Sequence, residues 1–350
     1  MTKTNSKNSI SVCLYDLARQ QDWETYIQNS DRTVFAHQLG WKSVVEETFK
    51  HRSIYIMAYR QRRVVGILPL VLVNSLLFGR FLTTSPFLTF GGIACDDEDV
   101  ASALVGRAIK IARDHQVTYV ELKNDTSYRC LSDTKTGYST LMLDLSPGGD
   151  EIWKSKLRPS ARRNVRRAEK AGLRVVEGHE HLDAFVDIYA RNMHRLGTPT
   201  HSRDFFESIL EHFPKTLLLL VQHRNSYIGG TLLVPFRNTI LMPWVCGLQE
   251  YFDLRPNNLL YWESIVRACD RGFRQLDFGR SKWNSGTFNF KSQYGAQPIQ
   301  LYYQYLLNTA RAVPSVDPEN PRFKSVIAVW RKLPLPVVNF LGPYIIRNIP

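Results

Sequence analysis

The segment TLLLLVQHRNSYIGGTLLV, residues 216–234, decides the fold because its pattern occurs twice in the chain. Two apolar stretches flank a short polar turn, which is typical of a β-hairpin. Residues 53–71, SIYIMAYRQRRVVGILPLV, have the same arrangement, and Gly66 stands where Gly229 stands. The distance between the two hairpins along the chain suits duplicated domains rather than a short-period solenoid.

The segments around each hairpin also repeat in the same order. A helical pattern precedes each hairpin, at 37–51 and 201–215, and a second helical pattern followed by a strand comes after it, at 101–124 and 258–280. The sequence therefore predicts an α/β (α+β) protein of two units. Each unit is expected to be a mixed, mostly antiparallel sheet flanked by helices.

The boundary between the units is predicted at the Pro-Gly-Gly cluster 147–149, because such residues favour loops. We expect an N-terminal domain over 1–146 and a C-terminal domain over 147–310. Residues 311–350 are expected to be a proline-containing linker and an amphipathic tail. The segment RPSARRNVRRAEKAG predicts a basic helix over 159–172, with Ser160 as its N-cap and Gly172 as its stop.

Composition narrows the function classes. A hydrophobic fraction of 44% excludes a disordered chain, and the formal charge of +13 favours an anionic partner. The five cysteines are scattered without histidines at metal spacing, so neither a zinc site nor a disulfide framework is expected. The N-terminus has no apolar core of signal-peptide length, and no later window approaches the length of a membrane span. We therefore expect a cytoplasmic protein that either stays free or lies peripherally at the inner membrane.

Short motifs near the C-terminal end carry a family resemblance. They are PNNLLY at 256–261, DFGRS at 277–281, SGT at 285–287, FK at 290–291, and YGA at 294–296 with Pro298. Each unit resembles the GNAT acyltransferase topology, and two in tandem resemble the FemABX family of peptidyl and aminoacyl transferases. The nearest likeness is to the FemAB-like subgroup that accompanies exosortase and exopolysaccharide gene sets, the PEP-CTERM systems, and it spans nearly the whole chain.

This resemblance implies two tandem GNAT-like acyl-CoA N-acyltransferase domains and an acyl- or aminoacyltransferase of the EC 2.3 type. The reaction implied is formation of an amide on an amine of an anionic or phosphate-linked precursor of the cell envelope or of exopolysaccharide, similar to peptidoglycan bridge formation. The co-substrate would be acyl-CoA or aminoacyl-tRNA, with no permanently bound cofactor. The segment GLQEYFDLRPNN lacks the glycine-rich pyrophosphate loop of CoA-dependent members, and the chain lacks room for the coiled-coil arm of some FemABX members. Both donors stay open.

Three residues are predicted to be catalytic: Lys291, Phe290 and Asp277. The resemblance implies that the Phe-Lys pair contacts substrate or donor and that the lysine stabilises developing negative charge. Structural alternatives are an exposed strand lysine and a local pair between Asp277 and Arg280. Glu263 and His201 are further conceivable bases.

The predicted substrate-binding residues lie in these motifs and on the basic helix: Arg280, Ser281, Asn257, Gly286, Thr287, Tyr294, Arg162, Arg163, Arg166 and Arg167. Arg280 offers a planar fork for phosphate or carboxylate. Gly229 and Gly230 are predicted to bring backbone amides to the acyl carbonyl, as in an oxyanion hole, or only to relieve strain in a hairpin. No metal ligand is predicted.

An alternative function belongs to another class. A degenerate transferase without activity would bind an anionic glycan precursor or nucleic acid through the basic helix, whose exposed face is otherwise a solvated surface. The tail, residues 322–350, either packs against the domains or lies at the inner membrane surface with Trp330 and Tyr344 as anchors.

Overall fold

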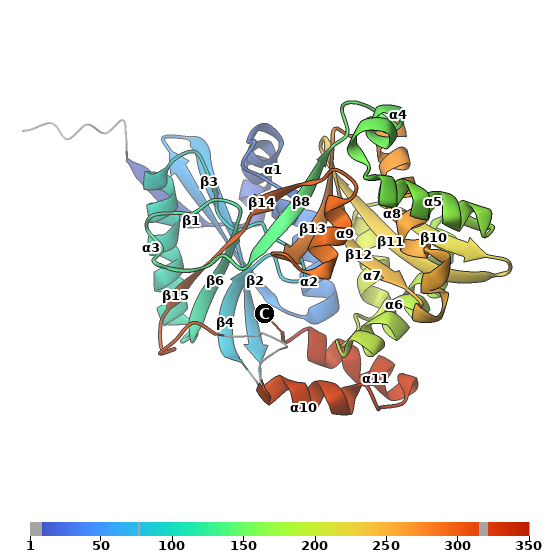
Figure 1. The fold of residues 1–350 in the computed structure, drawn as a ribbon. Coiled ribbons are helices and arrows are strands. Elements are labelled where there is room, and N and C mark those ends of the chain that lie inside the picture. Colours follow the sequence, from blue (N-terminus) through green and yellow to red (C-terminus); the bar gives the residue numbers. More distant parts are fainter. Residues whose placement is uncertain (1–8, 76–77, 315–320, 350) are drawn as a thin grey trace, which may run out of the picture. The chain divides into compact units, whose positions relative to one another are not determined.

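In a computed structural model, which describes residues 9–75, 78–314 and 321–349, the chain forms two compact units (Figure 1). Unit 1 comprises residues 1–137, 300–315 and 348–350, and unit 2 comprises residues 138–299 and 316–347. Side chains of residues 321–323 and most of the predicted linker, 315–320, lie outside the described residues. The predicted order of helix, hairpin, helix and strand is confirmed in both units.

Unit 1 is built on one mixed sheet in the order β1-β2-β3-β4-β6-β15-β7, with β5 paired to β3. The hairpin β2–β3 is antiparallel, whereas β4 and β6 run parallel. Its elements are β1 Ile10–Leu14, α1 Gln20–Asn29, α2 Leu39–Phe49, β2 Arg52–Arg60, β3 Arg63–Ser75, β4 Gly79–Thr84, β5 Ala94–Cys95, α3 Glu98–Asp114, β6 Tyr119–Asn124, β7 Asp133–Lys135 and β15 Tyr302–Leu307.

Helices cover both faces of this sheet, which explains why its central strands are apolar on both sides. Ile54 and Ile56 pack in the cluster that contains α3, while Tyr55 and Met57, which point to the other face, pack in the cluster that contains α1. Helix α3 begins at Asp97, whose carboxylate accepts the Val100 amide as an N-cap.

Unit 2 is built on a second mixed sheet in the order β14-β8-β13-β12-β11-β10-β9. Its elements are β8 Tyr138–Asp144, α4 Gly149–Glu151, the π-turn η4 Ile152–Lys156, α5 Pro159–Lys170, β9 Leu173–Glu177, α6 Leu182–Leu196, α7 Arg203–His212, β10 Leu217–His223, β11 Ser226–Phe236, β12 Thr239–Gly247, the 3₁₀ turn η6 Gln249–Leu254, α8 Pro256–Asp270, β13 Gln275–Lys282, α9 Gly286–Ser292, β14 Gln297–Gln300, α10 Pro321–Trp330 and α11 Leu335–Ile346.

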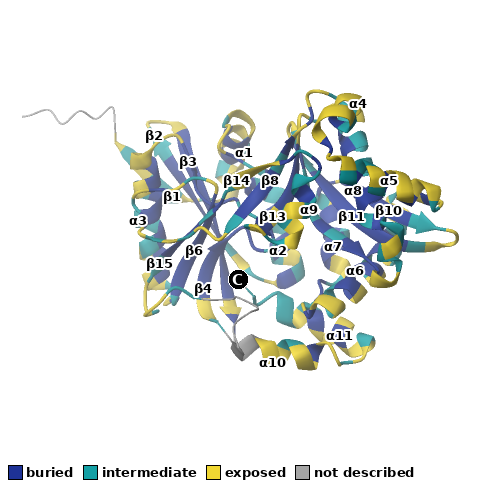
Figure 2. Ribbon diagram, in the orientation of Figure 1, coloured by how far each residue is buried: buried dark blue, intermediate teal, exposed yellow. Residues whose placement is uncertain are grey.

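The two faces of the second sheet carry different helices. Helices α5 and α8 close one face over a core of Leu141, Leu219 and Leu276, and the outer surface of α5 is mostly exposed (Figure 2). On the other face α6 and α7 pack through an aromatic cluster, in which the rings of Phe206 and Trp244 lie 5.8 Å apart. Both faces of the central strands are therefore buried.

Two strands lie in a different sheet from the one that their position in the chain suggests. Strand β8 precedes the predicted boundary at residue 146, but it pairs with β13 in unit 2. Strand β15 follows β14 closely, yet it pairs with β6 and β7 in unit 1. The observed division thus differs from the predicted domains at both ends of the second domain, because unit 2 begins with β8 and unit 1 completes its sheet with β15 from the C-terminal part of the chain.

The basic segment forms α5, but its start differs from the prediction. Arg158 is the N-cap and Pro159 occupies the first turn, where a missing amide costs nothing. The predicted cap, Ser160, instead donates to Gln293 Oε1 at 3.2 Å. Gly172 follows the helix with a φ of +78°, the left-handed conformation that a glycine stop adopts.

Candidate active site

Strands β12 and β13 separate after a short ladder in the middle of the second sheet. Their parallel pairing comprises Thr239 with Gln275, Ile240 with Leu276, and Leu241 with Asp277, and it ends there. Just beyond this point β12 bulges, because both Met242 and Pro243 stand opposite Leu233 of β11. Proline also removes one backbone donor. The part of β12 after Leu241 therefore leaves the ladder with β13 at the level of the DFGRS motif.

Strand β13 bends where β12 leaves it. Gly279 has a φ of +75°, a conformation that side chains with a Cβ rarely adopt, and the register with β8 shifts between Asp277 and Arg280. The Asp277 carboxylate supports this bend from within, because its Oδ1 accepts the Gly279 amide at 2.8 Å and the Thr140 hydroxyl. Asp277 is buried, and burial raises the pKa of its carboxyl above the ordinary value.

Lys291 holds the other side of the same bend. Its ammonium donates to the carbonyl oxygens of Gly279 at 2.9 Å and Arg280 at 3.0 Å, and only 8% of the residue is exposed. Burial lowers the pKa of Lys291 to about 8, with Asp277 opposing the shift and Arg280 adding to it. Two of the three ammonium donors are thus occupied. The structural alternative for Lys291 was an exposed lysine on a strand. Lys291 instead lies on helix α9 and is buried.

The short helix α9 positions this lysine. Ser285 caps it by accepting the Phe288 amide at 3.2 Å, and its hydroxyl also lies 3.0 Å from that of Thr287. The SGT motif is therefore a helix start, with Gly286 and Thr287 exposed in the first turn. Both remain open to a ligand, and their predicted role in binding stays a prediction.

Two predicted contacts of the substrate are packed inside unit 2 instead. Tyr294 is fully buried, and its hydroxyl donates to the carbonyl of Asn258 at 3.1 Å. Ser281 is buried as well. Phe290 is partly exposed and meets the Tyr261 ring edge to face at 5.0 Å. Tyr294 and Ser281 therefore help to form the structure that supports the site. A substrate would reach these buried side chains only if the surrounding residues moved.

Arg280 is the exposed charge of the motif. Its guanidinium lies over the ring of Tyr138 at 4.7 Å, so β8 supports it from below. Asp277 accepts from Gly279 and Thr140. Sequence reasoning missed Tyr138 and Thr140, since their strand was expected in the other unit. The strand sequence YSTLMLDL carries no signal for its partner strand.

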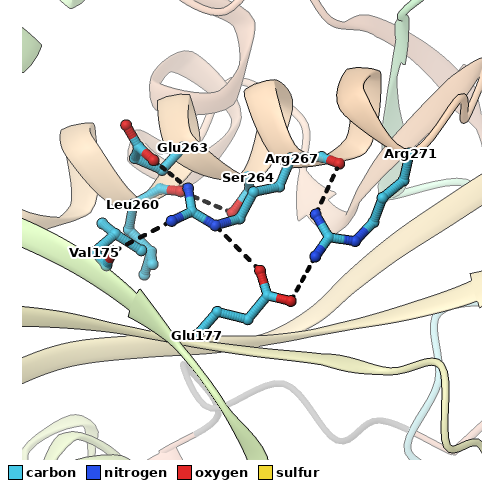
Figure 3. Close-up of polar contacts among 7 residues, drawn as sticks. All are labelled: Val175, Glu177, Leu260, Glu263, Ser264, Arg267 and Arg271. Atoms are coloured by element: carbon cyan, nitrogen blue, oxygen red, sulfur yellow. Dashed lines mark hydrogen bonds and ion pairs between the residues drawn. The ribbon is translucent and has the colours of Figure 1, made fainter.

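Helix α8, which brings the PNNLLY motif to β12, is fixed by an ionic network (Figure 3). Arg267 binds Glu177 of the edge strand β9 at 3.3 Å, pairs with Glu263 one turn earlier, and donates to the carbonyl of Val175 at 3.2 Å. Arg271 binds the second oxygen of Glu177 at 2.5 Å. The carboxylate of Glu263 thus forms an ion pair with Arg267, which argues against a role as the general base.

The start of α8 offers few free amides. Asn257 is half-buried, and its Oδ1 would lie 2.7 Å from a Cβ on Gly247, so the pair packs closely. Pro256 has no N–H, and the amides of Asn258 and Leu259 both point to the carbonyl of Arg255 at 3.1 and 3.4 Å. This turn therefore differs from a loop that presents several backbone donors to a pyrophosphate.

His201, the other conceivable base, lies in the aromatic cluster of α6 and α7. Its ring stacks on Phe205 with centroids 4.3 Å apart. Burial lowers the pKa of His201 to about 3, so the imidazole is neutral at physiological pH. Its buried position gives it a packing role.

The arginines of α5 line a surface groove of about 540 Å³ together with Pro159 and Lys170. Arg162 donates to the carbonyls of Trp153 at 2.9 Å and Lys154 at 2.6 Å, which ties α5 to the π-turn. Arg166 lies over the Trp153 ring at 5.6 Å. Arg163 and Arg167 extend into solvent. The groove thus combines one structural arginine with three exposed ones.

The glycine pair of β11 has a packing explanation. A Cβ on Gly230 would lie 2.5 Å from Leu220 Cδ2 and 3.0 Å from Phe185 Cδ2, so α6 and β10 approach this backbone closely. A Cβ on Gly229 would lie 3.1 Å from the carbonyl oxygen of Cys246. The released strand is β12, so its backbone is the better candidate for meeting an acyl carbonyl.

Unit 1 contains the corresponding parallel pair, but its own chain fills the separation. The ladder of β4 and β6 ends at Thr83 and Glu121. Directly after it, the Thr84 hydroxyl accepts the amide of Lys123 at 2.8 Å, and the carbonyl of Lys123 accepts the amide of Gly91 at 3.0 Å. The loop between β4 and β5 therefore occupies the place where a ligand would enter.

Buried charges complete this closure. Glu121 accepts the hydroxyls of Thr83 at 2.9 Å and Tyr305 at 2.8 Å, and its carboxylate lies 3.5 Å from the Lys123 ammonium. Such a satisfied buried network is rigid. Across the described ranges of both units, no group of three or more His, Cys, Asp or Glu side chains could hold a metal ion.

Residues 155–292 match the family described as "Acetyltransferase (GNAT) domain". Among solved structures, FemX has a TM-score of 0.66 at 14% identity, over 85% of this chain and 98% of that one. A tandem GNAT protein from the clavulanic acid biosynthesis pathway has a TM-score of 0.55 at 13% identity, over 88% and 100%.

A further solved structure, L-PGS from Bacillus licheniformis, has a TM-score of 0.55 at 11% identity, over 89% of this chain and 96% of that one. No curated protein matches the chain. At these identities the structural likenesses are likenesses of fold. The prediction of two tandem GNAT-like domains is confirmed, and the FemAB-like tandem arrangement is supported.

Proposed function

We propose that this protein is an acyltransferase that forms an amide, with the acyl donor bound in unit 2 where β12 leaves β13. The observation that carries the proposal is the difference between the two units. In unit 2 the parallel ladder ends at Leu241 and β12 bulges away, whereas in unit 1 a loop fills the equivalent place. Exposed backbone amides beside a splayed strand polarise an acyl carbonyl as an oxyanion hole does. The match of residues 155–292 to a GNAT acetyltransferase domain supports the same unit.

The reaction follows from this placement. The lone pair of the acceptor amine attacks the carbonyl carbon of an ester or thioester, a C–N bond forms, and the C–O or C–S bond breaks. The leaving oxygen or sulfur carries the electron pair away and takes a proton, and the amine loses one proton to water or substrate. Lys291 has one donor left after binding two carbonyls, and we assign that donor to the charge that develops on the acyl oxygen.

The donor is acyl-CoA or aminoacyl-tRNA. GNAT acyltransferases use acyl-CoA as co-substrate, which supports the first. The amides of Asn258 and Leu259 at the start of α8 are directed into their own turn, which favours a donor that is not held by its pyrophosphate at this point. We expect the exposed Arg280 to take a phosphate or carboxylate in either case.

The acceptor is an amine on an anionic, phosphate-linked precursor of the cell envelope or of exopolysaccharide, in a bacterium with an exosortase or PEP-CTERM system. The charge of +13 and the groove on α5 support an anionic substrate. Arg163, Arg166 and Arg167 would hold it, while Arg162 supports the helix.

The test is formation of a new amide, followed by mass spectrometry with purified protein, acyl-CoA or aminoacyl-tRNA, and amine-bearing precursors. Lys291→Met should lower turnover at least about ten-fold while the circular dichroism spectrum is kept, since one oxyanion donor is worth several kcal/mol. Lys215→Met, at an exposed lysine of the same unit, is the matched control. If no donor gives a product, the enzyme proposal is wrong.

The groove on α5 also favours one alternative, a binding protein without activity for an anionic glycan precursor or nucleic acid. A binder would give no product and would respond to Arg163→Gln with Arg167→Gln, and its affinity for nucleic acid would fall steeply with salt. In the enzyme the same double variant should raise KM and leave kcat largely unchanged, because these side chains lie on the outer face of α5.

A further inference from the structure

Helices α10 and α11 expose apolar side chains that are arranged in rows. On α11 these are Val337, Phe340, Leu341 and Tyr344, which are spaced at i, i+3, i+4 and i+7 and so share one face. On α10, Val326 and Val329 are exposed one turn apart. Phe340 is 68% exposed and Val326 is 64% exposed, so neither is covered by its neighbours. Much of both helices is coloured as exposed in Figure 2.

The opposite sides of the two helices are already packed within unit 2. Trp330 is buried and its carbonyl lies 3.1 Å from His194 Nε2 of α6. On α11, Val338 is fully buried, and a Cβ on Gly342 would meet the backbone of Thr200 at 3.0 Å. The rows therefore do not belong to the core of unit 2. They form a second apolar face on helices whose opposite face is already packed.

The charged side chains that α10, α11 and the residues after them carry are of one sign. Residues 321–350 contain no Asp or Glu, and Lys324, Arg331 and Lys332 are exposed beside the apolar side chains. The guanidinium of Arg347 lies over the ring of Tyr344 at 5.2 Å. An apolar face on helices whose own charged side chains are all cations is complementary to an anionic lipid surface, where side chains enter the acyl boundary and cations meet the headgroups.

We propose that the pair α10–α11 is a docking surface for an anionic lipid bilayer. The face formed by Val326, Val329, Phe340, Leu341 and Tyr344 enters the headgroup region, and Lys324, Arg331 and Lys332 bind the phosphates. In the described part of the chain no helix is long and apolar enough to cross a membrane, so the contact is peripheral. It brings unit 2 to the membrane surface independently of which acyl group it transfers.

Vesicle sedimentation tests the proposal with the full chain. Vesicles of phosphatidylglycerol and phosphatidylcholine in equal parts should bind the protein, and vesicles of phosphatidylcholine alone should bind it much more weakly. The double variant Phe340→Asn with Tyr344→Asn should lose at least about ten-fold in partitioning, because both rings lose their apolar transfer. Lys324→Gln with Lys332→Gln should lose about five-fold for each cation, and high salt should have the same effect.

The control is Leu17→Asn, which removes an 81% exposed apolar side chain from unit 1 and should leave binding unchanged. All variants change exposed residues, so urea midpoints equal to that of the parent verify the fold. Equal binding to both vesicle types, or parent-like binding of the Phe340/Tyr344 variant, would overturn the proposal. So would a dimer in solution that this variant dissociates while vesicle binding is absent, since the face then belongs to a second copy.

Discussion

Replacing Lys291 by methionine should change how the stability of unit 2 depends on pH. Burial lowers the pKa of Lys291 from 10.5 to about 8, and such a shift corresponds to about 3 kcal/mol of free energy against the charged form in the folded state. The methionine removes that cost. It also leaves the carbonyls of Gly279 and Arg280 without a donor, at about 1–3 kcal/mol each. The two effects oppose one another, so the change at a single pH does not discriminate.

The dependence on pH does discriminate. Between pH 8 and 10.5 the unfolded chain still binds the proton that the folded chain has lost, so the free energy of unfolding rises with pH over this window. The slope contributed by Lys291 reaches about 1.4 kcal/mol per pH unit, and the total gain is about 3 kcal/mol. Below pH 8 both states hold the proton, and Lys291 contributes no slope there.

Urea unfolding at a series of pH values between 7 and 10.5, followed by tryptophan fluorescence, measures this difference. The fluorescence signal reports mainly on unit 2, because most of the tryptophans belong to it: Trp153, Trp244, Trp262, Trp283 and Trp330. The parent should gain stability relative to Lys291→Met across the window. The control Lys215→Met, at an exposed lysine, should follow the parent. Parallel curves for the parent and Lys291→Met would show that the ammonium is not held in a desolvated site and would refute the reasoning.

Three further predictions concern the frame of unit 2. Glu177→Gln should lower the stability of unit 2 by about 1 kcal/mol, because Arg267 and Arg271 both lose a charged partner that is only partly exposed, and the loss should shrink in high salt when melting is followed by calorimetry. Gly230→Ala should cost about 1–3 kcal/mol in urea unfolding, since its Cβ would collide with Leu220 and Phe185, whereas Gly106→Ala, where a Cβ meets nothing within 4 Å, should not destabilise. His201→Phe should flatten the acid side of the stability curve: with a folded pKa of about 3, the unfolded state binds more protons between about pH 6.5 and 3, so the parent loses stability as pH falls, by up to about 1.4 kcal/mol per unit. A parent and a His201→Phe protein with the same acid dependence would contradict this.

Local patterns were sufficient for the repeated helix, hairpin, helix and strand of each unit but not for which strands pair with one another. The hairpins at 53–71 and 216–234 could be predicted because alternation and a polar turn are properties of neighbouring residues. The placement of β8 and β15 in their sheets could not be predicted from local patterns. Tyr138–Asp144 pairs with β13, a strand more than a hundred residues later in the sequence. A strand's own sequence says which face is apolar, and it does not say which edge is free.

The candidate site shows the same division at the level of single residues. Lys291 was predicted through the Phe-Lys pair of the family resemblance, and in the structure its ammonium is desolvated and lies on a seven-residue helix. Its partners are backbone carbonyls, which no sequence pattern specifies. Thr140, which binds the Asp277 carboxylate, was missed for the same reason as its strand.

The residues that carry the family resemblance therefore hold the backbone of β13 in a bent conformation, in addition to any contact with a substrate. Gly279 takes a left-handed conformation, the Asp277 carboxylate binds its amide from one side, and the Lys291 ammonium binds its carbonyl from the other. These contacts fix β13 in the bent form that keeps it away from β12. Substitution of Asp277 or Lys291 would alter the shape of the site as well as its chemistry, so loss of activity alone does not make either residue catalytic. Arg280 is exposed and binds Lys291 through its backbone carbonyl, which a glutamine keeps, so we expect Arg280→Gln to preserve this frame. A loss of turnover in that variant would therefore report more directly on contact with the substrate.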